Sequence, residues 1–191
     1  DGTQAVKEMR RMVNSFHDAG IAVIMDVVYN HTDGTGNSSL YDMTVPKYFY
    51  RLNSECGYSN GSGCGNEIAT NHKMVKKYVL DSLKHWMKDF HINGFRFDLM
   101  GVQEQETMSE IFCELKKIDP YVMLYGEPWT GGECAVKNGC STSVACGKNC
   151  GVGAFNDDFR DAIKGSEFGG FAKGQVQGIF CDSEIEKGLL G

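Results

Sequence analysis

The chain has 191 residues, of which 41% are hydrophobic and 11% aromatic, so it is long enough to bury a sizeable core as one ordinary domain. Its net charge of -6, without any basic cluster, argues against a nucleic-acid partner. No apolar run approaches the roughly 18 residues of a membrane-spanning helix, so we expect no membrane partner either.

The first part of the sequence predicts a helix, a strand and a long insertion. Apolar residues recur at spacings of three and four over 3–18, which predicts an amphipathic helix that ends near Gly20. The apolar run 21–28 contains Asp26 and predicts a strand covered on both faces, as in a parallel sheet. The polar stretch 32–70 predicts a long loop or a small subdomain, and loops of this length usually carry function.

The rest of the sequence alternates between helices and strands. The expected elements, in order, are a helix over 71–90 capped by Thr70, a strand over 95–99, a helix over 103–118, a strand over 121–126, a Gly- and Cys-rich loop over 130–153, a short strand over 154–156 and a helix over 157–164 that ends at Gly165. The tail gives little signal.

This alternation predicts an α/β fold of βα units around a parallel sheet. An open doubly wound sheet and a TIM (β/α)8 barrel both fit it. No G-x-G-x-x-G sequence opens a helix after a strand, so the usual dinucleotide signature is missing. Charged residues stand at the carboxyl ends of successive strands, where barrel active sites lie, and we therefore favour the barrel.

The loop over 130–153 contains four of the eight cysteines, Cys134, Cys140, Cys146 and Cys150. Their spacing includes no C-x2-C pair of the zinc-ribbon kind. We therefore expect free thiols there rather than a disulfide or a metal site. Free thiols indicate a reducing compartment, which slightly favours a cytoplasmic over a secreted location.

Asp98 and Glu127 each end an expected strand, and they form the candidate catalytic pair. Breaking an acetal link between sugars needs a carboxylate on one face of the anomeric carbon and a carboxylic acid beside the leaving oxygen. Arg96 shares a strand face with Asp98, and its charge suits an ionised nucleophile. Trp129 gives Glu127 an apolar wall, which suits a proton donor. The same spacing is explained about as well by a non-catalytic alternative, in which the strand charges form a buried structural ion pair and Glu127 is merely an exposed residue at a strand end.

Further polar and aromatic residues stand close to these strand ends. Asp26 is expected to be structural, as the partner of Arg96 on the adjacent strand. Asn30 and His31 follow their strand and would line the mouth of a barrel, where the His is either a ligand contact or merely solvated. Tyr29 and Trp129 are either stacking platforms for sugar rings or packing residues.

Three segments, read in order, resemble the first three motif regions of the alpha-amylase superfamily of glycoside hydrolases. They are Asp26-Val27-Val28-Tyr29-Asn30-His31-Thr32, Gly94-Phe95-Arg96-Phe97-Asp98 and Gly126-Glu127-Pro128-Trp129. Further stretches at 60–67 and 155–165 are similar to type I pullulanases, the bacterial debranching enzymes. The resemblance covers nearly the whole chain.

The resemblance implies a retaining hydrolase on a (β/α)8 barrel that cleaves α-1,6 branch linkages in pullulan, starch or glycogen-type α-glucans by double displacement. The family's nucleophile falls on Asp98 and its acid/base on Glu127. Arg96 and His31 match residues that hold the sugar, and Asp26 matches a supporting residue. Asn30 matches a calcium ligand of many amylases that debranching relatives do not all keep, so no cofactor is required and calcium is left open.

The family pattern is incomplete in this chain. Its fourth region, which supplies a third carboxylate, has no match before Gly191, and the strands that should precede Asp1 are absent. We therefore expect residues 1–191 to be a fragment of a single catalytic barrel domain that is inactive alone. The alternatives are an α-1,4-acting amylase or neopullulanase, and a non-catalytic α-glucan-binding protein. Linkage preference, compartment and oligomeric state stay open.

Overall fold

The computed structural model describes residues 1–137, 139–140, 151–166 and 170–190. These residues belong to two compact units, Asp1–Ala154 and Phe155–Gly191, which we describe one at a time. Among the described residues, no helix combines the length and the apolar character needed to cross a membrane.

The first unit is built on one parallel sheet. Its strands are β1 (Ile24–Val27), β2 (Gly94–Phe97), β3 (Met123–Gly126) and β4 (Gly153–Ala154), and they pair in the order β1-β2-β3-β4. The prediction of an α/β fold with a parallel sheet is therefore confirmed. The described strands do not close on one another, so the complete barrel stays a prediction.

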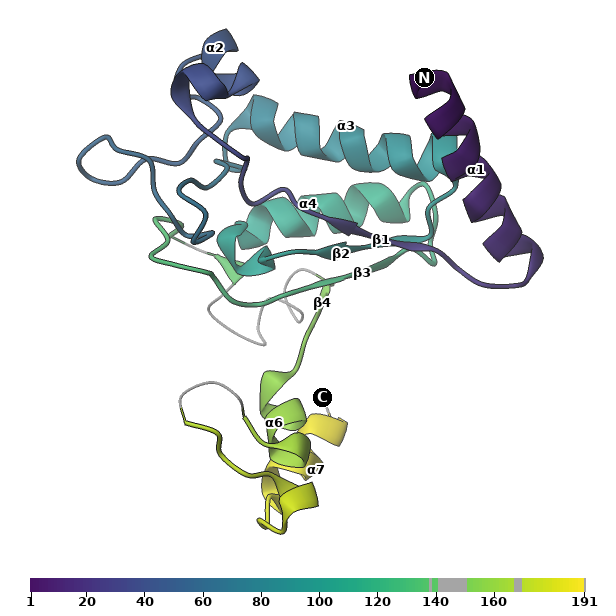
Figure 1. The fold of residues 1–191 in the computed structure, drawn as a ribbon, viewed down its shortest axis with the longest axis vertical. Helices are drawn as coiled ribbons and strands as arrows, with labels where there is room; N and C mark the ends of the chain where they lie inside the picture. Colours follow the sequence, from purple (N-terminus) through teal and green to yellow (C-terminus); the bar gives the residue numbers. More distant parts are fainter. Residues whose placement is uncertain (138, 141–150, 167–169, 191) are drawn as a thin grey trace. The chain divides into compact units, whose positions relative to one another are not determined.

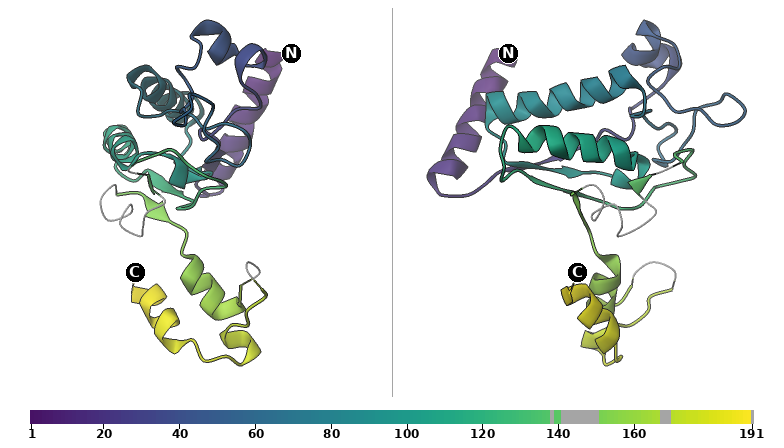
Figure 2. Two further views of the ribbon diagram at one scale, coloured as in Figure 1. Left: turned by 90° about the vertical axis from the view of Figure 1, so that its left-hand side faces the viewer. Right: turned by 180° about the vertical axis from the view of Figure 1, so that it is seen from behind.

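Two helices, α3 (Lys73–Phe90) and α4 (Gln105–Lys116), run side by side over one face of this sheet (Figure 1, Figure 2). The main core lies between the helices and the sheet. Phe95 and Phe97 point into it from β2, with exposures of 0% and 2%. Because side chains alternate along a strand, Arg96 must point to the opposite face.

This opposite face of the sheet is accessible. Met123 on β3 is 55% exposed, and the side chain of Asp26 on β1 is 64% exposed. The prediction that the first strand is covered on both faces is therefore wrong for the described residues, because helices cover only one side of the sheet. The shorter strand also places Ile21 outside β1, and Ile21 is exposed.

The first helix, α1 (Gly2–Asp18), forms as its periodicity predicts, and Asp1 caps it by accepting a hydrogen bond from the Thr3 N–H at 3.1 Å.

The expected cap of α3 is wrong: His72, not Thr70, precedes the helix. Thr70 is fully buried, and its hydroxyl oxygen lies 2.7 Å from Gln103 Oε1. A tertiary contact has therefore replaced the local cap.

The insertion over 32–70 contains a short 3-10 turn, η1 (Gly36–Ser38), and a short helix, α2 (Leu40–Thr44). It packs around a second apolar cluster that includes Tyr50, Ile68 and Val75. Because Val75 belongs to α3, this cluster attaches the insertion to the start of that helix.

The second unit contains α6 (Asp157–Lys164), the 3-10 turn η4 (Gln175–Gln177) and α7 (Asp182–Leu190). The first of these has the predicted bounds, and Gly165 ends it at a φ of 87° that favours glycine. The sequence did not predict α7. It packs closely on α6, since a Cβ atom at Gly188 would lie 2.3 Å from Phe159 Cδ2.

Candidate active site

Four charged side chains meet at the carboxyl ends of β1, β2 and β3. Arg96 Nη1 donates to Asp26 Oδ1 and to Asp98 Oδ1, each at 2.9 Å, and Nη2 forms an ion pair with Glu127 Oε1. The register explains this meeting, because Arg96 pairs with Asp26 on β1 and Glu127 directly follows β3. The predicted convergence of Asp98 and Glu127 is therefore found around one guanidinium.

The electrostatics of this cluster are unbalanced. Burial disfavours the charge on Arg96, yet the hydrogen bonds that it donates to Asp26 and Asp98, together with the charge of Glu127, raise its pKa above its ordinary value. One cation faces three carboxyl groups, so the cluster keeps excess negative charge when all of them are ionised. Such a site suits a reaction in which positive charge develops on a sugar ring.

Asp98 is fixed by a second residue besides Arg96. Asn30 Nδ2 donates to both Asp98 O and Asp98 Oδ2, each at 2.9 Å, and the Asp98 N–H donates to Val27 O at 3.0 Å. Asn30 is fully buried, whereas 28% of the Asp98 side chain is exposed. The carboxylate is thus held rigidly with one side open to a ligand, as a nucleophile requires.

Glu127 is held by the turn η2 (Met100–Val102) and the residue before it. The Leu99 N–H donates to Glu127 Oε2 at 2.8 Å, and the Gly101 N–H donates to Glu127 O at 2.9 Å. Leu99 adopts a φ of 40°, a strained conformation of the kind found at functional sites. Arg96 and Leu99 thus each donate to one carboxyl oxygen of Glu127, and Gly101 holds its backbone.

His31 is oriented by Asn30. Because Nδ2 of Asn30 donates to Asp98, its Oδ1 must accept, and it lies 2.5 Å from His31 Nδ1. The proton of a neutral His31 is therefore on Nδ1, and Nε2 is left as an acceptor for a ligand hydroxyl.

The hydrogen bonds of Asn30 do not fit a calcium ligand. Its Oδ1 contacts His31, and its backbone oxygen accepts from the Ile68 N–H at 2.8 Å. Within residues 1–137, 139–140, 151–166 and 170–190, no group of three or more His, Cys, Asp or Glu side chains is arranged to hold a metal ion. We therefore derive no step through calcium.

The two aromatic candidates lie differently. Tyr29 packs against the main core, and its hydroxyl lies 2.8 Å from Ser82 Oγ on α3, which supports the packing interpretation. Trp129 is half-buried, and its backbone lies against η2. A Cβ atom at Gly101 would lie 2.3 Å from Trp129 O, so only glycine allows this approach.

The expectation of free thiols in the Cys-rich loop is wrong at Cys140, which is disulfide-bonded and fully buried. Cys134 has a free thiol. Burial raises the pKa of the Cys134 thiol to about 11, so it stays protonated at neutral pH. Cys146 and Cys150 lie outside the described residues.

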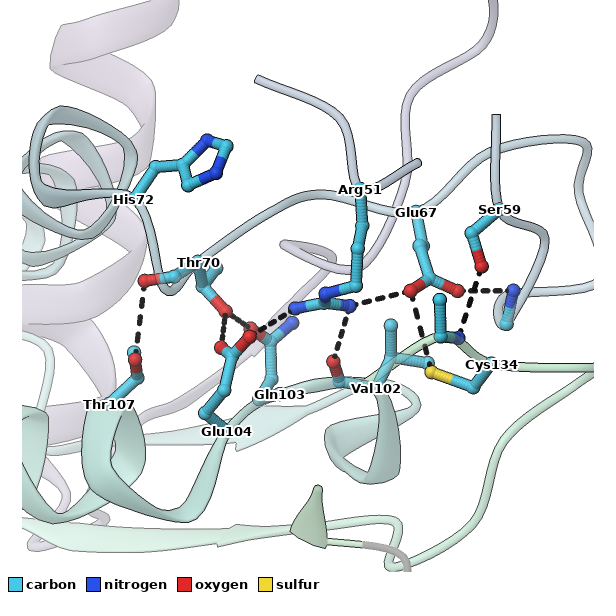
Figure 3. Close-up of polar contacts among 12 residues, drawn as sticks. Arg51, Ser59, Glu67, Thr70, His72, Val102, Gln103, Glu104, Thr107 and Cys134 are labelled. Atoms are coloured by element: carbon cyan, nitrogen blue, oxygen red, sulfur yellow. Dashed lines mark hydrogen bonds and ion pairs between the residues drawn. The ribbon is translucent and has the colours of Figure 1, made fainter. Parts of the chain in front are cut away.

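Sequence reasoning also missed a buried ion cluster that contacts η2 through the backbone oxygen of Val102. Arg51, Glu67 and Glu104 form two ion pairs there (Figure 3). The available signal was a charge inside an apolar run, since Arg51 follows three consecutive aromatic residues. The same signal, a charge inside an apolar run, identified Asp26, Arg96 and Asp98 in the expected strands.

No protein-family model matches the chain. Comparison with individual proteins, however, consistently finds pullulanases. It is 38% identical over 162 residues to a pullulanase of Bacillus subtilis (strain 168), a match that covers 84% of this chain and 22% of that protein. The pullulanase from Bacillus acidopullulyticus superposes with a TM-score of 0.93 at 42% identity, over 100% of this chain and 24% of that one.

A second solved structure is the pullulanase from Paenibacillus barengoltzii in complex with maltohexaose and alpha-cyclodextrin. It superposes with a TM-score of 0.86 at 36% identity, over 96% of this chain and 28% of that one. The chain therefore spans between 22% and 28% of the lengths of these three proteins.

Proposed function

Since this chain is a homologue of the pullulanases, the debranching enzymes of the alpha-amylase family, we propose that it supplies the central part of the catalytic barrel of a longer α-1,6-glucosidase. The observation that carries the proposal is the convergence of Asp98 and Glu127 on Arg96. Two carboxyl groups beside one glycosidic bond are what retaining hydrolysis needs. Residues 1–191 are proposed to be inactive alone.

Hydrolysis would proceed in two displacements at the anomeric carbon. In the first, an Asp98 oxygen bonds to that carbon while its bond to the glycosidic oxygen breaks, and Glu127 gives a proton to the departing oxygen. In the second, water gives a proton to Glu127 and its oxygen bonds to the anomeric carbon, which releases Asp98 with its electron pair. The sugar is thereby transferred to water with retention.

The surrounding residues would prepare these steps. Asn30 and Arg96 hold the two Asp98 oxygens, so the nucleophile needs little rearrangement. His31 would accept a hydroxyl hydrogen of the bound glucose unit through Nε2. When substrate binds, Glu127 would exchange its contact with Arg96 for a contact with the glycosidic oxygen, to which it then gives its proton.

The proposed substrate is an α-glucan with α-1,6 branches. The Paenibacillus barengoltzii pullulanase was solved in complex with maltohexaose and alpha-cyclodextrin, which supports an oligosaccharide ligand for the corresponding region of this chain. The proposed α-1,6 linkage rests on the similarity to the pullulanases.

Product analysis on pullulan tests this function in the full-length enzyme. Release of maltotriose is expected, since it results from cleavage at α-1,6 bonds. Panose as the product would instead show α-1,4 cleavage, and binding of pullulan without any product would show a non-catalytic glucan-binding protein.

A further inference from the structure

Glu67, Arg51 and Glu104 place three charges in the interior of the first unit, away from the proposed catalytic residues. The Glu67 side chain is 0% exposed, and that of Arg51 is 10% exposed. Burial opposes the charge on Arg51, yet the two carboxylates outweigh it and raise its pKa above the ordinary value. Buried ion pairs are weak evidence for stability, because apolar residues of similar size often stabilise as well. This cluster therefore points to a positional role.

Glu67 attaches the insertion to the chain that follows Glu127. Its Oε2 accepts from the Gly61 N–H at 2.6 Å, and its Oε1 accepts from the Cys134 thiol at 3.5 Å (Figure 3). The carbonyl of Gly61 in turn accepts from the N–H groups of Gly131 and Gly132, at 2.8 Å and 3.1 Å. The carboxylate thus organises both sides of the contact between 59–67 and 131–135.

The two segments approach too closely for side chains at this contact. A Cβ atom at Gly131 would lie 2.2 Å from Ser62 O, and one at Gly61 would lie 2.6 Å from Cys134 Sγ. The segment after Glu127 is therefore held at a defined position against the insertion rather than merely near it.

Arg51 connects the same cluster to η2. Its Nη1 donates to Glu67 Oε1 at 2.6 Å and to Val102 O at 3.3 Å, and its Nη2 forms an ion pair with Glu104 (Figure 3). Gly101, the middle residue of this turn, donates through its N–H to the backbone oxygen of Glu127 at 2.9 Å. Glu67, through Cys134, and Arg51, through η2, therefore both connect the cluster to the segment that carries Glu127.

We propose that Glu67, through its ion pair with Arg51, is a positioning residue that sets the placement of the acid/base Glu127. The inference rests on the proposed function. It assigns to the insertion a part in proton transfer, and it explains why a charge is kept in the core. A displacement of about 1 Å at a reacting group can cost about 100-fold in rate, so small movements of this cluster matter.

The test uses the full-length enzyme with Glu67→Gln, which keeps the size of the side chain and removes its charge. Two substrates are compared: pullulan, whose leaving group needs a proton, and α-maltotriosyl fluoride, whose C–F bond breaks without one. We expect pullulan hydrolysis to fall about 10- to 100-fold. First-turnover release of fluoride, which reports bond formation by Asp98, is expected to stay within about twofold of the parent.

The matched control is Glu114→Gln, which removes a carboxylate from the ion pair of Lys84 and Glu114 between α3 and α4. It is expected to leave both rates unchanged. Equal losses on the two substrates in Glu67→Gln would show a merely structural residue, and unchanged rates on both would show no role. Either result overturns the inference.

Cys134→Ala covers the case in which Glu67→Gln does not fold. It leaves the ion pair intact and removes one contact between Glu67 and the segment after Glu127. Hydrolysis of pullulan alone is expected to fall about 2- to 5-fold, as for the loss of one weak hydrogen bond. Unchanged rates, or equal losses on both substrates, again overturn the inference. Full pullulan activity in Glu127→Gln would instead overturn the proposed function itself.

Discussion

Asn30 donates through one amide nitrogen to both the backbone oxygen and the carboxylate of Asp98, each at 2.9 Å, although 68 positions separate the two residues. The same side chain contacts His31 through its oxygen. Asn30 therefore orients two groups of the proposed site at once, and it does so from a fully buried position.

Replacing Asn30 with Ala should therefore damage catalysis more than folding. Asp98 would lose one of its two restraints, and His31 would lose the acceptor that fixes its proton on Nδ1. We expect kcat on pullulan to fall about 10- to 100-fold in the full-length enzyme. Steady-state kinetics and a melting curve check this. An unchanged kcat would show that Arg96 alone is sufficient to hold the nucleophile.

Removing either carboxylate of the candidate pair should abolish most activity. Asp98→Asn removes the attacking oxygen's charge, and Glu127→Gln removes the transferable proton, which is typically worth about 100- to 10,000-fold. Pullulan assays of the full-length variants measure both losses. Asp81→Asn, at an exposed ion pair with Lys77 on α3, is the control and should stay near the parent. Near-normal turnover in either site variant would refute its assigned role.

Asp42 should make the stability of the protein depend on acid pH. Burial opposes its charge, yet the hydroxyl of Tyr58 and two backbone N–H groups outweigh burial and hold its pKa below the ordinary value of 3.8. A lowered folded pKa means that the stabilisation is complete above the ordinary value and is lost as pH falls through the folded value.

Asp42→Asn is therefore expected to be about 2 kcal/mol less stable than the parent at pH 7, because it weakens hydrogen bonds to a charged group. The difference should shrink as the pH falls below 3.8. Denaturant unfolding at a series of pH values measures it. A difference that does not change with pH would mean that the charge of Asp42 contributes nothing.

The meeting of Asp98, Glu127 and Arg96 was predictable from the sequence. All three stand at or near the ends of strands that alternate with helices, and parallel strands bring their carboxyl ends to one edge of a sheet. Strand alternation also placed Arg96 and Asp98 on the same face. For these residues, position along the chain was enough to give position in space.

Other parts of the site depended on contacts that no periodic pattern describes. The capping role expected for Thr70 was lost to a buried bond with Gln103, and Glu67 meets Cys134 across 67 positions, each residue lying in an irregular segment. A loop residue's partner depends on how two irregular segments pack, and the cost of burying a charge says only that some partner must exist. The sequence therefore determined which carboxylates share the sheet edge. Only the tertiary structure decided which donors hold them, because hydrogen bonds between loops depend on distances of a few tenths of an ångström.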